Sequence, residues 1–143
     1  MKIEFVELNR DNWENCANLT DKEDNYIYPN LYSIAEAQFY EKAISRAIFS
    51  NEEMVGYSLF GEDENDSEVW AIDRFMIAKA FRRNGYGAEA IIAIVEEGRS
   101  RGFKRFITST AEKNEAMQSL LTKLGFKTNL EKRDNEIVYF IEE

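Results

Sequence analysis

Apolar and polar residues alternate along several short stretches of this chain, and a period of two predicts β-strands. We expect the first strand over residues 3–8. A hairpin follows, with strands over residues 46–49 and 54–60, and Gly56 is expected to weaken the second of them. After an acidic loop, a longer strand is expected over Val69–Ile77. Tight turns join antiparallel strands, so this part of the chain predicts an antiparallel sheet.

Apolar residues spaced three and four apart predict the helices. We expect a short helix over residues 11–19 and a second over residues 33–43, which starts at a capping box. The clearest apolar stripe predicts a helix over residues 87–99 that packs against the sheet. A last helix is expected over residues 114–124, closed by Gly125 as its C-terminal cap.

Two further segments complete the pattern. A strand is expected over residues 105–109, and a final hairpin over residues 127–141 turns at residues 133–135. The order of elements predicts an α/β fold with a mixed sheet and flanking helices. The chain has 143 residues with one Pro and seven Gly, and nothing in it reads as a linker, so residues 1–143 are predicted to form one domain.

Composition removes several classes of function. The chain has no His and one cysteine, Cys16, which excludes an internal disulfide and a Ser-His-Asp triad and makes a metal cofactor unexpected. Its net charge of −9 argues against nucleic acid and suits a cationic small molecule better. No apolar run matches a leader peptide or a membrane span, so we expect a cytoplasmic protein that does not bind membranes.

Residues 82–88, with the sequence Arg-Arg-Asn-Gly-Tyr-Gly-Ala, lie between an expected strand and an expected helix. Glycines let the backbone turn tightly, and the free N–H groups of a helix N-terminus, helped by Arg82 and Arg83, suit a pyrophosphate. This pattern predicts an anion site. A glycine turn with solvated arginines is the simpler alternative.

The same glycines also satisfy a dinucleotide-binding fingerprint, Gly85-x-Gly87-x-x-Ala90. That fingerprint requires a βαβ unit and an acidic residue at the end of the next strand. The strand expected over residues 105–109 offers no acid, and the strands before the loop are expected to be antiparallel. The sequence therefore disfavours a dinucleotide site.

The loop instead resembles that of the GNAT superfamily of acetyltransferases, which reads Arg or Gln, two residues, Gly, one residue, then Gly or Ala. Arg82, Gly85 and Gly87 fit it. Residues 114–126, which begin with Asn114 and end in Leu-Gly-Phe, resemble the family's asparagine-containing helix. The resemblance implies the GNAT fold, with splayed central strands, acetyl-CoA as co-substrate and a homodimer.

The resemblance also implies roles for individual residues. Main-chain groups of Phe75 and Ile77 would bind the pantetheine arm of acetyl-CoA. Asn114 would lie near the pantetheine or the thioester sulfur, although Asn is also an ordinary helix N-cap. The pyrophosphate would be held by the loop that contains Arg82, Arg83, Asn84, Gly85, Tyr86, Gly87 and Ala88.

The segment from Tyr28 to Ala37 resembles one found near the acceptor entrance of bacterial diamine and polyamine N-acetyltransferases, and residues 70–74 resemble the central strand of that subgroup. The resemblance makes spermidine, spermine or a related diamine the expected acceptor. It offers four acceptor-binding candidates, Tyr28, Asn30, Tyr32 and Glu36. Glu36 also completes a capping box with Ser33, and that structural duty is enough to explain it.

Amine acetylation requires a group that removes a proton, because an ammonium has no lone pair and about one part in a thousand of an alkylamine is neutral at pH 7. Asp73 is the candidate base. It precedes the stretch expected to bind pantetheine and matches the position of a glutamate in related polyamine acetyltransferases. A structural ion pair with a nearby cation is the alternative interpretation of Asp73.

Leu121 departs from the family pattern, because many members carry there a tyrosine that protonates the departing CoA thiolate. Water, the new ammonium, or one of Tyr26, Tyr28 and Tyr32 could supply that proton. Cys16 has no activating neighbour in the sequence, so direct attack by the amine in a ternary complex is expected. The alternative functions are acetylation of an amino-sugar, an amino acid or a peptide N-terminus, and a catalytically weak acetyl-CoA sensor.

Overall fold

A computed structural model of the chain describes residues 3–20 and 29–143. One seven-stranded sheet has the order β1-β2-β3-β4-β5-β7-β6. Its strands are β1 (Glu4–Glu7), β2 (Ala43–Ser50), β3 (Glu53–Glu62), β4 (Val69–Ile77), β5 (Arg105–Ala111), β6 (Lys132–Arg133) and β7 (Glu136–Glu142). The helices are α1 (Trp13–Ala17), α2 (Asn30–Ala37), the 3₁₀ turn η1 (Lys79–Phe81), α3 (Tyr86–Ser100) and α4 (Glu115–Lys123).

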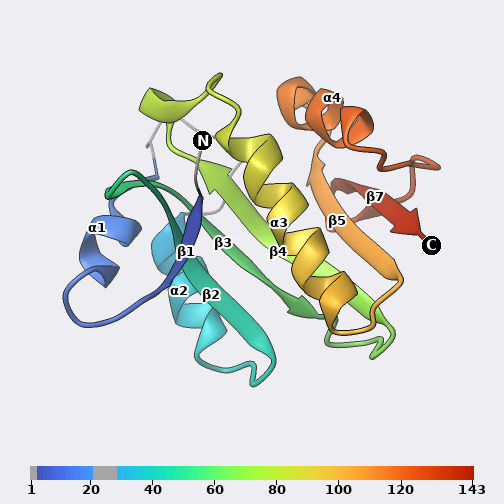
Figure 1. Ribbon diagram of the computed structural model, residues 1–143. Coiled ribbons are helices and arrows are strands. Elements are labelled where there is room, and N and C mark those ends of the chain that lie inside the picture. The colour runs from blue at the N-terminus through green and yellow to red at the C-terminus, as the bar shows by residue number, and fades with distance from the viewer. Residues whose placement is uncertain (1–2, 21–28) are drawn as a thin grey trace.

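Helices cover both faces of the sheet (Figure 1). On one face α3 and α4 enclose the larger core, in which Trp70 and Ile72 of β4 join Ile91, Ile94 and Leu121. On the other face α1 and α2 pack over β2, β3 and β4, with a smaller core that contains Cys16, Tyr57, Leu59 and Met76. Alternate residues of β3 and β4 therefore face different layers, as the period of two requires.

The sheet splits between β4 and β5, the only pair that is parallel among the described strands. Their pairing ends at Ile72 and Thr108. Beyond this point β4 continues to Ile77 beside β3, and β5 continues to Ala111 beside β7. At the same place β4 contains a β-bulge, because Ile72 pairs with Phe60 and Arg74 pairs with Leu59, which leaves Asp73 as the extra residue.

Most elements agree with the sequence predictions, and the mixed sheet with flanking helices confirms the expected fold. The bounds of β4 are those predicted, and Gly125 follows α4 with a φ of +95°, as a C-terminal cap requires. Strand β3 continues through Gly56, but its pairing with β2 shifts register beside this glycine, since Ile48 pairs with Gly56 and Phe49 with Met54. A Cβ at Gly56 would lie 2.3 Å from the carbonyl oxygen of Met76, so glycine lets β3 and β4 approach each other closely.

The prediction for α2 was wrong. The helix spans Asn30–Ala37 with Pro29 as its N-cap, and Ser33 lies inside it, 1% exposed, rather than at its start. The fixed φ of proline suits a helix start, which explains why the helix begins before the apparent capping box. The helix ends at Ala37 because the chain turns and enters β2 at Ala43, where pairing with β3 takes over.

Within residues 3–20 and 29–143, no helix is both long and apolar enough to cross a membrane. The same residues hold no group of three or more His, Cys, Asp or Glu side chains suited to a metal ion.

Candidate active site

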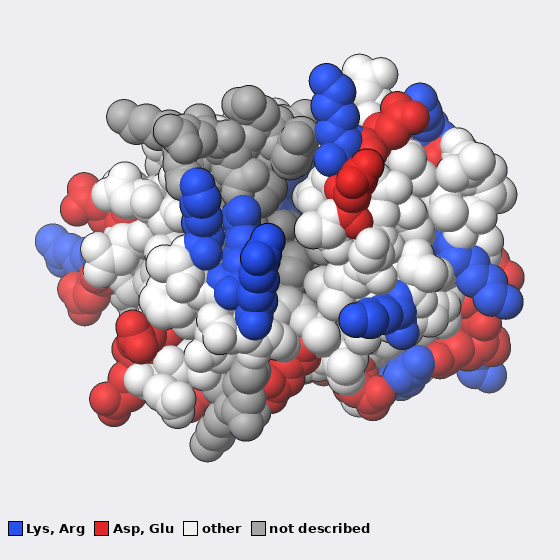
Figure 2. Space-filling view, turned by 90° about the horizontal axis from the view of Figure 1, so that it is seen from above, with Lys and Arg blue, Asp and Glu red and all other residues white. Residues whose placement is uncertain are grey.

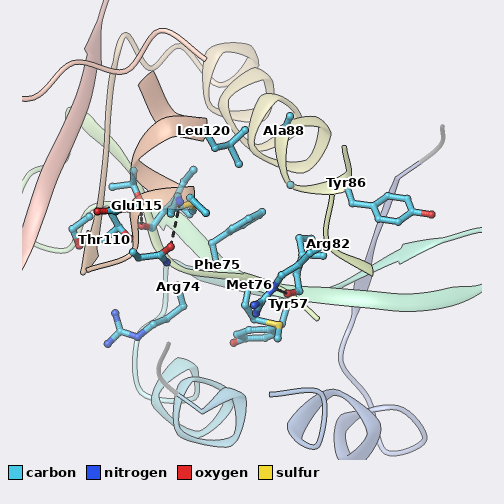
Figure 3. Close-up of a pocket in the computed structure, with 18 of the residues that line it drawn as sticks. Tyr57, Arg74, Phe75, Met76, Arg82, Tyr86, Ala88, Thr110, Glu115 and Leu120 are labelled. Atoms are coloured by element: carbon cyan, nitrogen blue, oxygen red, sulfur yellow. Dashed lines mark hydrogen bonds between the residues drawn. The ribbon is translucent and has the colours of Figure 1, made fainter. Parts of the chain in front are cut away.

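A cavity of about 670 Å³ lies in the split between β4 and β5. Figure 3 shows that Phe75 of β4 and Leu120 of α4 approach each other across it, whereas Arg74 extends away from them. Of the residues predicted to form the site, it is lined by Asn30, Asp73, Phe75, Ile77, Arg82, Arg83, Gly85, Tyr86, Gly87, Ala88 and Asn114. Three segments distant in the sequence therefore meet at one opening in the sheet.

The main chain of β4 turns hydrogen-bonding groups toward this cavity. The carbonyl of Arg74 faces β3, where it accepts a 2.7 Å hydrogen bond from Ser58 Oγ. Because main-chain groups alternate along a strand, those of Phe75 and Ile77 face the split. The carbonyl of Ile77 accepts a 2.8 Å hydrogen bond from Arg82 Nε. No described strand pairs with this edge, so Phe75 can offer both of its main-chain groups to an extended ligand.

The loop before α3 forms an anion-binding geometry. Gly85 has a φ of +83° and Arg83 a φ of +67°, which turn the chain sharply into the helix. The first intrahelical bond runs from Glu89 N–H to the Gly85 carbonyl at 3.2 Å. The N–H groups of the first turn before Glu89 therefore have no carbonyl partner within the helix and point out of its N-terminus.

Basic side chains surround the same end of the molecule. Seen from above, several Lys and Arg side chains gather at this end of the molecule (Figure 2). Arg82 and Arg83 line the cavity, whereas Asn84 does not. The Asn84 amide instead donates to the carbonyls of Phe81 and Arg82, at 3.1 and 3.2 Å, and so holds the turn. Positive charge and helix N–H groups together favour a pyrophosphate at this end.

Gly87 brings α3 and α4 close together. A Cβ at Gly87 would lie 3.3 Å from Leu120 Cδ2 and 3.9 Å from the Phe75 ring. Asn114 caps α4, since its Oδ1 accepts a 3.2 Å hydrogen bond from Met117 N–H, and it also lines the cavity. The side chain thus performs the ordinary capping role while it stands beside the open edge of β4.

Asp73 lies at the bulge, where the split begins. Its side chain is in contact with solvent, but the walls of the cavity displace much of the surrounding water. This desolvation is the largest cause of the raised pKa of Asp73, which is about 6. The carboxylates of Asp63, Glu36 and Glu64 raise the pKa further, and the Arg74 guanidinium opposes them. At pH 7 the carboxylate is mostly ionised, and it is a stronger base than an ordinary aspartate.

The four acceptor candidates have different surroundings. Asn30 lines the cavity but is 1% exposed, and its amide donates to the Cys16 carbonyl at 2.8 Å, which ties α1 to α2. Tyr32 is 54% exposed and is not part of the lining. Glu36 forms a 3.6 Å ion pair with Arg74. Tyr28 lies outside the described residues, as does Tyr26.

Leu121 is fully buried in the core between α3 and the sheet and does not line the cavity. Its neighbours on α4, Met117 and Leu120, face the cavity instead. The leucine therefore stabilises the attachment of α4, and no proton donor stands at this position.

A second wall of the cavity, formed by β5 and β7, was not predicted from the sequence. Thr108, Ser109 and Thr110 contribute hydroxyls, and Glu136 contributes a carboxylate that accepts a 2.7 Å hydrogen bond from Ser109 Oγ. Tyr57 of β3 also lines the cavity. Only the pairing of β5 with β7 brings Ser109 and Glu136 together, and that pairing has no local signal in the sequence.

A split sheet, an open strand edge, an anion site at a helix N-terminus and a carboxylate at the bulge together define an acyl-CoA-dependent transferase. The chain belongs to the acetyltransferase (GNAT) family, whose model matches residues 4–126. It is an acetyl-CoA-dependent N-acetyltransferase that uses an amine acceptor. The residues fit acetyl-CoA, because the basic helix terminus suits its pyrophosphate and the open edge of Phe75 suits its amide-bearing arm.

Solved structures share this fold at low sequence identity. A domain from Methanocaldococcus jannaschii is 18% identical with a TM-score of 0.81, and the match covers 99% of each chain. A GNAT family acetyltransferase from Elizabethkingia anophelis with acetyl-CoA bound is 14% identical with a TM-score of 0.72, covering 99% of this chain and 97% of that one. The ribosomal-protein-S18-alanine N-acetyltransferase of Escherichia coli is 14% identical with a TM-score of 0.76, covering 99% and 94%. No curated protein matches the chain by sequence.

Proposed function

We propose that the chain transfers the acetyl group of acetyl-CoA to a primary amine of a polyamine such as spermidine or spermine. The observation that carries this proposal is the acidic environment of Asp73. This carboxylate lies where the split opens, and Asp63, Glu36 and Glu64 are near enough to raise its pKa. A cationic amine is attracted to such a site, whereas the carboxylate of a free amino acid is repelled from it.

Different residues of the cavity have different roles in the reaction. When bound, acetyl-CoA supplies the thioester carbonyl carbon that the amine nitrogen attacks, and the C–S bond breaks as the C–N bond forms. The main chain of Phe75 and Ile77 holds the pantetheine arm in extended form beside the bulge. The loop from Arg82 to Ala88 holds the pyrophosphate, and Asn114 lies beside the arm. Both reactants are thereby fixed at the same point of the split.

Asp73 accepts the proton that the amine must lose. At pH 7 its ionised form both attracts the ammonium and removes the proton, directly or through one water. Cys16 does not form an acetyl-enzyme, because it is fully buried and burial raises the pKa of its thiol to about 12. The amine therefore attacks directly. With Leu121 in the core, the CoA thiolate takes its proton from water or from the protonated nitrogen of the adduct that amine attack forms, which leaves a neutral amide.

The experiment measures release of the CoA thiol with spermidine, an amino-sugar, an amino acid and a peptide N-terminus at equal enzyme concentration. We expect spermidine to give the highest kcat/KM and Asp73→Asn to lower it strongly. Turnover of spermidine no better than that of the other amines would overturn the polyamine assignment. Binding of acetyl-CoA without thiol release for any amine would instead favour a sensor.

By family resemblance alone, we also propose a homodimer in the cytoplasm. Sedimentation at several protein concentrations checks the first part, and a purely monomeric species would contradict it. Cell fractionation checks the second.

A further inference from the structure

The wall of the cavity opposite Asp73 carries a second carboxylate, Glu136 at the start of β7. Residues paired across antiparallel strands share a face of the sheet. Thr108 and Thr110 pair with Tyr139 and Ile137, whose side chains join the core beneath α3 and α4. By alternation, Ser109 and Glu136 face the opposite side of the sheet, and their hydrogen bond agrees with this.

That side is also the one on which the acceptor would enter. Arg74, next to Asp73 on the bulge, pairs with Leu59 in the core beneath α1 and α2 and makes its ion pair with Glu36 of α2. Asp73 itself is within electrostatic reach of Glu36. The two arms of the split therefore present Asp73 and Glu136 on the same side of the sheet and into one cavity.

Glu136 is held in place but its charge is not balanced. Its carboxylate is half-buried and accepts one hydrogen bond from the neutral Ser109 hydroxyl at 2.7 Å. Among the ion pairs of residues 3–20 and 29–143, none includes Glu136. Arg133 lies directly across from Glu136 on β6, but its guanidinium pairs with Glu131. Two further cations line the cavity near this side, but Arg74 is paired with Glu36, and Lys113 has no ion pair with Glu136. A half-buried carboxylate with one neutral donor is best satisfied by a cationic partner.

We propose that Glu136, positioned by Ser109, binds the second ammonium group of a diamine or polyamine whose first amine is acetylated beside Asp73. This inference rests on the proposed function and adds a residue that selects the acceptor. A monoamine has no group for Glu136, so the site prefers a diamine of the same carbon length. The preference comes from binding and not from proton transfer, so it lies mainly in KM for the acceptor.

The test compares kcat/KM for putrescine with that for butylamine, and for cadaverine with that for pentylamine, in the natural protein and in Glu136→Gln. We expect the natural protein to prefer each diamine by roughly tenfold or more, as an ion-paired hydrogen bond allows, and Glu136→Gln to lose most of that ratio. Ser109→Ala should lose part of it, since the carboxylate is then untethered. Glu142→Gln is the control, because Glu142 lies on the same strand, is exposed, pairs with Arg105 and does not line the cavity.

Each other outcome has a distinct meaning. An unchanged diamine-to-monoamine ratio in Glu136→Gln overturns the role of Glu136 while the enzyme remains an amine acetyltransferase. Equal turnover of diamine and monoamine by the natural protein does the same. Turnover of peptides or amino-sugars with none for any polyamine overturns the proposed function together with this inference. A KM for acetyl-CoA that stays constant in Glu136→Gln shows that the variant is folded.

Discussion

The two sides of the split sheet differ in charge. On the side of α3, the helix N-terminus with Arg82 and Arg83 forms a positive site. On the side of α2, Asp73 lies within reach of Asp63, Glu36 and Glu64 and forms a negative one. The reaction joins an anionic donor and a cationic acceptor, and the sheet separates the sites proposed for them everywhere except at the opening between β4 and β5. The opening is therefore where charge, and not shape alone, brings the two reactants together.

The largest effect is expected from reversing the charge at the positive side. Gly87→Glu adds a Cβ 3.3 Å from Leu120 Cδ2 and a carboxylate at the helix N-terminus, where it repels the pyrophosphate. We expect acetyl-CoA affinity to fall by about a hundredfold or more, measured by calorimetry. Gly87→Ala is the control, since it adds the Cβ without the charge, and it should lose far less. Equal losses in both variants would show that packing against α4, and not charge, controls this site.

On the negative side, removing the proposed base comes next. Asp73→Asn keeps the size of the side chain but cannot accept a proton, so kcat/KM for spermidine should fall by about a hundredfold. The KM for acetyl-CoA should not change, because Asp73 stands on the acceptor side. Asp66→Asn is the matched control, since Asp66 is partly exposed and lies 3.8 Å from Arg105 outside the cavity. A loss of less than threefold in Asp73→Asn would contradict the assignment of the base.

Lowering the pH is expected to have a smaller effect on the same negative side. The pKa of Asp73 is about 6, so kcat/KM of the natural protein should fall about tenfold for each pH unit below 6, as this carboxylate becomes protonated. Asp73→Asn should lack this inflection. A profile with no inflection between pH 5 and pH 7 in the natural protein would exclude Asp73 as the titrating group.

The same pKa has a consequence for stability with the opposite sign. The folded-state pKa of Asp73 lies above its ordinary value of 3.8, so the ionised group destabilises the fold, and stability from this group falls as pH rises from about 4 to about 6. Asp73→Asn should therefore raise Tm at pH 7 and not at pH 4. Thermal melts at the two pH values check this, and a lower Tm at pH 7 would contradict it.

The smallest effect is expected at the ion pair that borders the negative side. Glu36→Gln removes the 3.6 Å pair with Arg74, and both side chains are partly exposed, so the free energy of unfolding should fall by less than about 1 kcal/mol. Urea unfolding measures it, with Glu14→Gln on the exposed face of α1 as control. A loss above about 2 kcal/mol would assign Glu36 a structural role far larger than its geometry indicates.

Local patterns allowed much of the fold to be predicted. The apolar stripe of α3 and the alternation in β4 depend on neighbouring residues, and both elements were predicted within a residue or two. The loop from Arg82 to Ala88 was found for the same reason. Helix α2 was placed wrongly because Ser33 and Glu36 have the spacing of a capping box, while Pro29 starts the helix earlier. When two short sequence signals predict different helix starts, tertiary packing determines which start the helix adopts.

The candidate site was harder to predict where it depends on strand order. The bulge at Asp73 arises from the register between β3 and β4, and the wall with Ser109 and Glu136 arises because β7 lies next to β5. Neither the bulge nor this wall can be recognised from the residues near it in the sequence. Leu121 shows the converse, because it occupies the position of a catalytic tyrosine in many family members, whereas its own side chain is buried in the core.

The placement of β7 between β5 and β6 has a consequence for biosynthesis. A chain synthesised only as far as α4 contains β4, the loop and β5, but the edge of β5 that later pairs with β7 then has no partner along its whole length. An unpaired strand edge readily joins other chains. Residues 136–142 are synthesised after β4, β5 and α4, so the nascent protein acquires both the covered edge and the carboxylate of Glu136 in one later step.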